Sequence, residues 1–84
     1  MRLERLDESI PCQADFSGGK VTPLRFRRGG RDHVVNAVHS RWLDRAGRHP
    51  QFYFSAETES GDVYELRLDS GDMTWHLQSV MLEG

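Results

Sequence analysis

Arginines and aromatic residues are interspersed through the middle of the chain, a combination that suits nucleic-acid binding. Small β-barrels that bind nucleic acids contact phosphates with cationic side chains and stack bases on exposed rings. Trp42 and Tyr53 are the rings expected to face solvent. The sequence therefore predicts a nucleic-acid interface formed by Arg25, Arg27, Arg28, Arg31, Arg41, Trp42, Arg45, Arg48 and Tyr53.

A purely structural role is the alternative for these residue types. Strand alternation places Phe26, Phe52 and Phe54 in the predicted core. The arginines would then form a solvated face, with their apolar stems covering the edges of the sheet. The sequence leaves both interpretations open.

Sites for nucleotides and metals have little support in the sequence. Gly29 and Gly30 could present backbone amides to a phosphate, but no Walker-type Lys-Ser/Thr follows them, so a tight hairpin turn is expected. The chain has no Cys-x-x-Cys or His-x-x-x-His spacing, and the acidic turns lack a complete calcium loop. No metal and no cofactor is predicted. The side chains of types that could bind a metal are Cys12, His33, His39, Asp62, Asp69, Asp72 and His76.

A catalytic site is likewise not expected. Cys12 could be combined with His33 or His76, but none of the three lies in a recognisable nucleophile elbow or catalytic loop. The sequence also offers no glycine-rich helix N-terminus that would form an oxyanion hole. The prediction is a protein that is not an enzyme and has no small-molecule substrate.

The charge of the chain is divided along its length, although the net charge is only −2. Residues 25–48 carry seven arginines and two aspartates, which gives +5. Residues 57–84 carry seven acids and one arginine, which gives −6, and residues 1–24 sum to −1. The three values add to −2, so a basic middle segment is followed by an acidic C-terminal segment. Such segments could attract each other between copies of the chain.

Length and composition favour a single small domain, residues 1–84. A chain of 84 residues supports one hydrophobic core. The lone Cys12 cannot form an internal disulfide, which favours a reducing compartment. The N-terminal residues 1–8 alternate charge with leucine and lack a signal-peptide core, and no stretch is long and apolar enough to span a membrane. A cytoplasmic protein without membrane association is expected.

Apolar residues alternate with polar ones in several short runs that are separated by glycine turns. This period of two is typical of strands with one buried face. Strands are expected at residues 10–16, 24–27, 33–42, 51–58, 63–68 and 73–82. The alternation of residues 33–42 is irregular and predicts a β-bulge, or a strand that curls and buries both faces in turn. Residues 1–8 are expected to be flexible or to form a short helical turn.

The predicted fold class is therefore all-β, a small antiparallel meander of about six strands that forms a barrel or a strongly curled sheet. The turns are expected at Ser17–Lys20, Arg28–Arg31, Glu59–Asp62 and Asp69–Asp72, with a polar loop over residues 43–50. Inward side chains are expected at Ile10, Cys12, Ala14, Phe16, Leu24, Phe26, Phe52, Phe54, Ala56, Tyr64, Leu66, Leu68, Met73, Trp75 and Leu77.

A recurring set of turn glycines and core aromatics resembles a known family. The residues are Pro23, Arg25, Phe26, Gly29, Gly30, His33, Val35, Arg41, Trp42, Tyr53, Gly61, Val63, Tyr64, Glu65, Leu66, Gly71, Trp75 and Leu77. They resemble a small bacterial family of unknown function that occurs alone and as a C-terminal appendage of catalytically inactive Y-family polymerase-like proteins of mutagenic repair. The similarity covers residues 7–82. It implies an accessory module linked to DNA repair and transfers no catalytic residue.

Two functions are compatible with these observations. The first is a non-catalytic module that contacts nucleic-acid phosphates through the basic hairpin around residues 25–31. The second is a protein-binding or self-associating module, in which the basic segment meets an acidic segment or an unpaired edge strand recruits a partner. Arginines that converge on one face would favour the first, and scattered arginines the second.

Overall fold

The structure is a computed structural model that describes residues 1–83, and over these residues it is all-β. Its seven strands are β1 (Arg2–Ile10), β2 (Cys12–Asp15), β3 (Thr22–Arg28), β4 (Arg31–Asp44), β5 (Gln51–Thr58), β6 (Val63–Asp69) and β7 (Thr74–Leu82). No helix long and apolar enough to cross a membrane occurs within residues 1–83. The predicted fold class is confirmed.

The N-terminal segment differs from the expectation. Residues 2–10 are not helical but form strand β1, which pairs with β7 at one edge of the sheet. A bulge lies between Arg5 and Glu8, where Asp7 has a φ of 53°. The backbone pairing with β7 is a long-range contact, and the local sequence alone did not indicate it.

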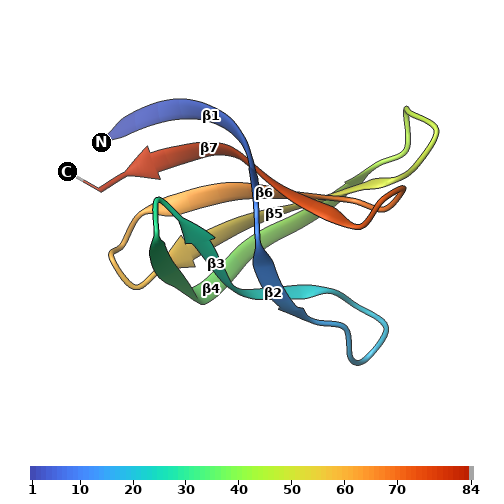
Figure 1. The fold of residues 1–84 in the computed structure, drawn as a ribbon, viewed down its shortest axis with the longest axis horizontal. Coiled ribbons are helices and arrows are strands. Elements are labelled where there is room, and N and C mark those ends of the chain that lie inside the picture. The colour runs from blue at the N-terminus through green and yellow to red at the C-terminus, as the bar shows by residue number, and fades with distance from the viewer. Residues whose placement is uncertain (84) are drawn as a thin grey trace.

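The strands form one antiparallel sheet in the order β1-β7-β6-β5-β4-β3-β2. β1 and β2 follow each other in sequence, yet they lie at opposite edges of this sheet. Figure 1 shows the blue ribbon crossing from β7 to β3, so the sheet is strongly curled into a half-barrel. Pro11 marks the passage between the two strands, and its carbonyl accepts a hydrogen bond from the Arg27 amide at 3.1 Å.

The core lies inside the curl and follows the predicted alternation most closely in β5, β6 and β7. The buried apolar side chains are Ile10, Phe26, Phe54, Ala56, Tyr64, Leu66, Leu68, Trp75, Leu77 and Val80. Burial of these side chains is the main favourable contribution to folding. The intervening residues of the same strands face the outer side of the sheet.

The predicted bulge in β4 is confirmed. The pairing of β4 with β5 shifts between Val35 and Ala37, and again between Val38 and Ser40. Each shift changes which face the following residues occupy. Val35 and Val38 therefore both pack against the core, although they are three residues apart.

Three residues expected in the core are exposed instead: Phe16 at 55%, Leu24 at 47% and Met73 at 56%. The pairing of β2 with β3 shifts between Gln13 and Ala14, and Pro23 is buried in place of Leu24. Met73 has a φ of 60° and belongs to the turn before β7. Phe16 lies just beyond the last residue of β2.

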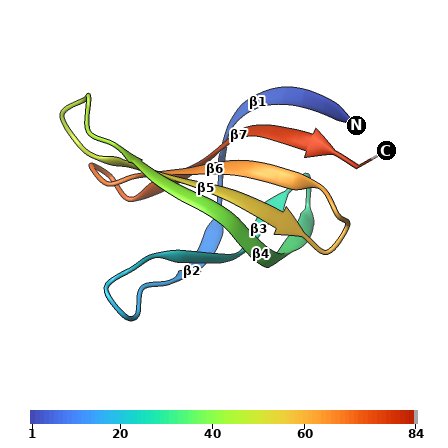
Figure 2. The same cartoon turned by 180° about the vertical axis from the view of Figure 1, so that it is seen from behind.

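The sheet is open on one side, along a seam. β3 pairs with β4 only from Arg25↔Val34 to Arg28↔Arg31. Among the residues that the structure describes, the part of β4 beyond Val34 pairs with β5 alone. Figures 1 and 2 both show the β2–β3 hairpin diverging from the far end of β4. The seam is the space between that hairpin and residues 35–44 of β4.

Candidate binding site

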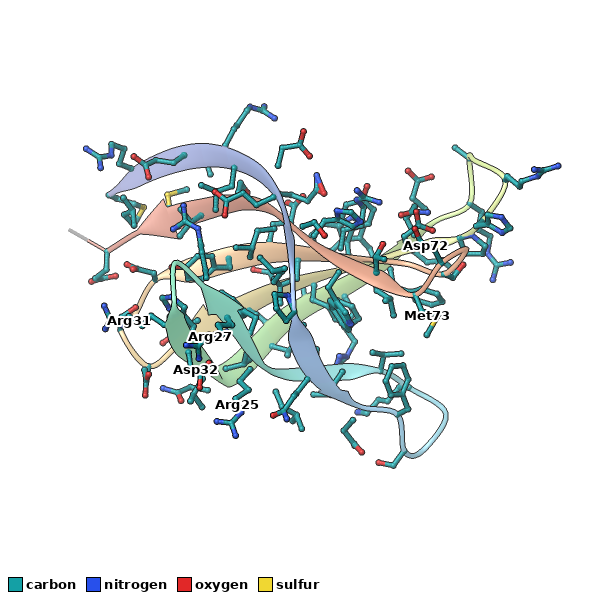
Figure 3. All side chains as sticks on the ribbon, viewed as in Figure 1. Arg25, Arg27, Arg31, Asp32, Asp72 and Met73 are labelled. Carbon is teal, nitrogen blue, oxygen red and sulfur yellow. The ribbon has the colours of Figure 1, made fainter. Side chains whose placement is uncertain are left out.

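Three of the four arginines of the β3–β4 hairpin lie close to a carboxylate, and Arg31 of the turn is the fourth. Arg27 forms an ion pair with Asp32 at 2.9 Å, and Arg25 lies 3.9 Å from the same carboxylate. The labelled side chains of Arg25, Arg27 and Asp32 gather beside this hairpin in Figure 3. All three are about half exposed, so the pairs contribute little to stability. They do reduce the positive potential of the hairpin.

Arg28 is held by an acid from another strand. Its Nε and Nη2 donate to the two carboxylate oxygens of Glu8 at 2.9 and 3.2 Å. This bidentate contact lowers the pKa of Glu8, and it raises the pKa of Arg28. The pair connects β1 to the β3–β4 hairpin, which gives Arg28 a structural role.

The predicted interface residues do not form one surface. The hairpin turn at residues 28–31 lies at one end of β4, whereas Arg45 and Arg48 lie in the loop after the other end. Figure 1 shows these two turns at opposite ends of the molecule. The structure does bring Trp42 and Tyr53 together on the adjacent strands β4 and β5, whereas the neighbouring Arg41 pairs with Phe54 on the other face of the sheet.

A largely apolar pocket of about 510 Å³ opens to solvent at the seam. The turn after β2, the end of β4 and the start of β5 form its walls. It is lined by Phe16, Gly19, Lys20, Val21, Arg41, Trp42, Leu43, Phe52, Tyr53 and Phe54. These residues define the seam pocket. Its lining contains two basic side chains and no carboxylate within residues 1–83.

Arg41 ties the two sides of the seam together. Its Nη1 and Nη2 donate to the Val21 carbonyl and to the Thr22 Oγ1, both at 3.2 Å. Its guanidinium also lies 5.8 Å from the centre of the Phe54 ring. Arg41 is therefore fixed across the mouth of the pocket, and it presents a positive charge there.

Trp42 and Tyr53 form a stacked pair. Their ring centroids are 5.3 Å apart, and the ring planes differ by 5°. They are cross-strand neighbours, and strand alternation places their side chains on the face opposite Phe52 and Phe54. Trp42 is 43% exposed and Tyr53 is partly buried, so the pair offers an aromatic surface formed mainly by Trp42.

Phe16, Lys20 and Leu43 belong to the seam pocket but were not among the predicted site residues. Phe16 was expected in the core. The Gly18-Gly19 turn, predicted from sequence and confirmed by two positive φ angles, was the one local signal for this part of the pocket. It indicates a hairpin, but it does not indicate what the hairpin faces.

Cys12 and His33, two of the candidate catalytic residues, lie in largely apolar surroundings. Burial raises the pKa of the Cys12 thiol to about 12, so it is protonated at neutral pH. His33 packs against Phe26 and Tyr64 instead. No group of three or more His, Cys, Asp or Glu side chains within residues 1–83 is arranged to hold a metal ion.

No family model, curated protein or solved structure matches this chain. The resemblance to the bacterial repair-associated family therefore stays a prediction.

Proposed function

We propose that the chain is a non-catalytic interaction module that binds a segment of a partner protein in the seam pocket. The observation that supports this function best is the pocket itself. Leu43 and Phe16 carry exposed apolar side chains at its mouth, 38% and 55% exposed. Open apolar surfaces beside a few polar groups are typical of binding sites.

The ion pairs of the β3–β4 hairpin favour the seam pocket over the basic segment as the contact surface. Asp32 and Glu8 already partner Arg25, Arg27 and Arg28 within the chain. Self-association through the basic and acidic segments would have to compete with these pairs. It is retained as a weaker form of the proposal, in which low salt favours oligomers.

A second candidate function is contact with single-stranded nucleic acid, and the stacked pair Trp42–Tyr53 favours it. Bases stack on exposed rings of this kind. The flanking loop carries Arg45 and Arg48, which would supply phosphate contacts. In this form of the proposal, the module is a DNA-repair accessory, as the family resemblance implies.

Fluorescence anisotropy with two probes tests these functions. Dodecapeptides selected on the immobilised chain from a random library are one probe, and labelled oligothymidine is the other. We expect Phe16→Ser to weaken peptide binding by about tenfold, the equivalent of about 1.4 kcal/mol. Leu3→Ser is the matched control, because Leu3 is also 55% exposed but lies outside the pocket. It should change the affinity less than about twofold.

The outcomes separate the two candidates. Oligothymidine binding that weakens steeply with salt and is lost in Trp42→Ala, without peptide binding, would replace the protein function by the nucleic-acid function. Failure of both probes would contradict the proposed module.

A further inference from the structure

The backbone of β4 has an unpaired edge where it borders the seam pocket. Successive residues of a strand direct their N–H and C=O groups alternately to the two sides, so the pairing of β5 shows which groups of β4 are free. The Ser70 amide donates to the Pro50 carbonyl at 3.2 Å, on the outer side of the pair Gln51↔Asp69. In an antiparallel ladder, such a flanking bond marks a pair that does not itself exchange hydrogen bonds. The backbone groups of Gln51 therefore point away from β6 and toward β4.

The same alternation of backbone hydrogen bonding determines which groups of β4 bond to β5. Gln51 pairs with Asp44, and Tyr53 pairs with Trp42 without a bulge between them. Asp44 and Trp42 are thus bonded to β5, and the N–H and C=O groups of Arg41 and Leu43 point to the other side. Among residues 1–83, no backbone group pairs with them from that side.

The free edge and the seam pocket share these two residues. The side chains of Arg41 and Leu43 lie on the same face as Phe54 and Phe52, their cross-strand partners. A strand added to this edge would point alternate side chains into the pocket. The same strand would bring its backbone groups to the free groups of β4.

The charge of the pocket limits the chemistry of such a strand. Lys20 and Arg41 are the charged residues of its lining, and both are cationic. A carboxylate on the incoming segment would meet these two charges, whereas a basic side chain would be repelled.

We propose that the partner is an extended peptide segment that adds to the free edge of β4 at Arg41 and Leu43. It places an apolar side chain in the seam pocket and an acidic side chain near Lys20. This inference rests on the proposed function and specifies its ligand. Two free positions on β4 correspond to a contact of about four residues on the partner. Recognition of the backbone supplies affinity, and the pocket supplies selectivity.

The test compares Leu43→Pro with Leu43→Ala, using the peptides selected on the wild-type chain. Proline removes the Leu43 N–H, which faces the seam, and leaves the hydrogen bonds with β5 in place. Leu43→Ala is the matched control, because it shortens the same side chain and keeps the N–H. We expect Leu43→Pro to weaken binding at least about tenfold more than Leu43→Ala does. The amide spectra of both variants report whether the sheet stays folded.

A second readout does not depend on the proline variant. The Arg41 and Leu43 amides should become protected from hydrogen exchange when the peptide binds, and a peptide N-methylated at its contacting positions should lose affinity. Peptides that need Phe16 but bind Leu43→Pro and Leu43→Ala equally would overturn the strand addition and leave the pocket as the binding site. If no peptide binds and the chain instead forms dimers that Leu43→Pro abolishes, a second copy is the occupant and the inference is wrong.

Discussion

The surroundings of His33 oppose protonation of its ring. Its ring stacks on Phe26, with centroids 5.1 Å apart, and lies 5.7 Å from the ring of Tyr64. Partial burial lowers the pKa of His33, and the nearby positive charges of Arg31 and Arg28 lower it further. Burial raises the pKa of Tyr64 in the same cluster. The cluster favours uncharged side chains at this end of the core.

This environment predicts a pH dependence of stability. Since the pKa of His33 is lower in the folded chain than in the unfolded one, the unfolded state takes up the proton first as the pH falls. The free energy of unfolding should therefore decrease below about pH 6.5, the ordinary histidine pKa. In urea denaturation, His33→Phe should lose less stability between pH 7 and pH 5 than the wild type or His49→Gln. An equal loss in all three proteins would contradict the account of His33.

At the scale of single residues, the sequence identified part of the candidate site. Trp42, Tyr53 and Arg41 were predicted, because arginines and aromatic residues are interspersed in this part of the sequence. Phe16 and Leu43 were not predicted to line a site, because their exposure depends on the divergence of the β2–β3 hairpin from β4. That divergence is a property of distant parts of the chain.

At the scale of the strands, the alternation of apolar and polar residues predicted the buried positions correctly where strand pairing is regular. In β5, residues 51–57 pair with residues 63–69 of β6 without interruption, and the predicted inward residues of β6 are buried. It failed at Leu24, beside the register shift in the β2–β3 pair, and at Met73, in a turn. A register shift exchanges the two faces of a strand, so an error of one residue reverses the prediction.

The turn before β7 packs closely against the loop that follows β4. A Cβ atom at Gly71 would overlap the Cγ and Cδ2 atoms of the His49 ring. Gly71→Ala should therefore lower the free energy of unfolding by about 1 kcal/mol, because the ring must move. In a His49→Ala background the same change should have almost no effect, as a double-mutant cycle measured by urea denaturation would show. The same loss in both backgrounds would show that the clash is not the cause.

In the whole molecule, the curled sheet brings segments of opposite charge beside one another. His39 lies 2.7 Å from Glu57 across β4 and β5, and Arg28 pairs with Glu8 across β3 and β1. The division of charge along the sequence is correct as arithmetic, yet Arg25 and Arg27 lie beside Asp32 of the same basic segment, and Arg28 pairs with Glu8 of the N-terminal segment. Sequence cannot reveal this, because the strand order decides which charges become neighbours.

The proposed binding site requires a sheet that is open along the seam, so that β4 keeps a free edge beside the pocket. Amide hydrogen exchange of the free chain, followed by NMR, measures this directly, because exposed backbone groups exchange faster than paired ones. If the seam is open, the Trp42 amide, which is bonded to β5, should exchange slowly. The Arg41 and Leu43 amides on either side of it should exchange fast. A Leu43 amide that exchanges as slowly as that of Trp42 would show that the seam is closed, and would contradict the binding site described above.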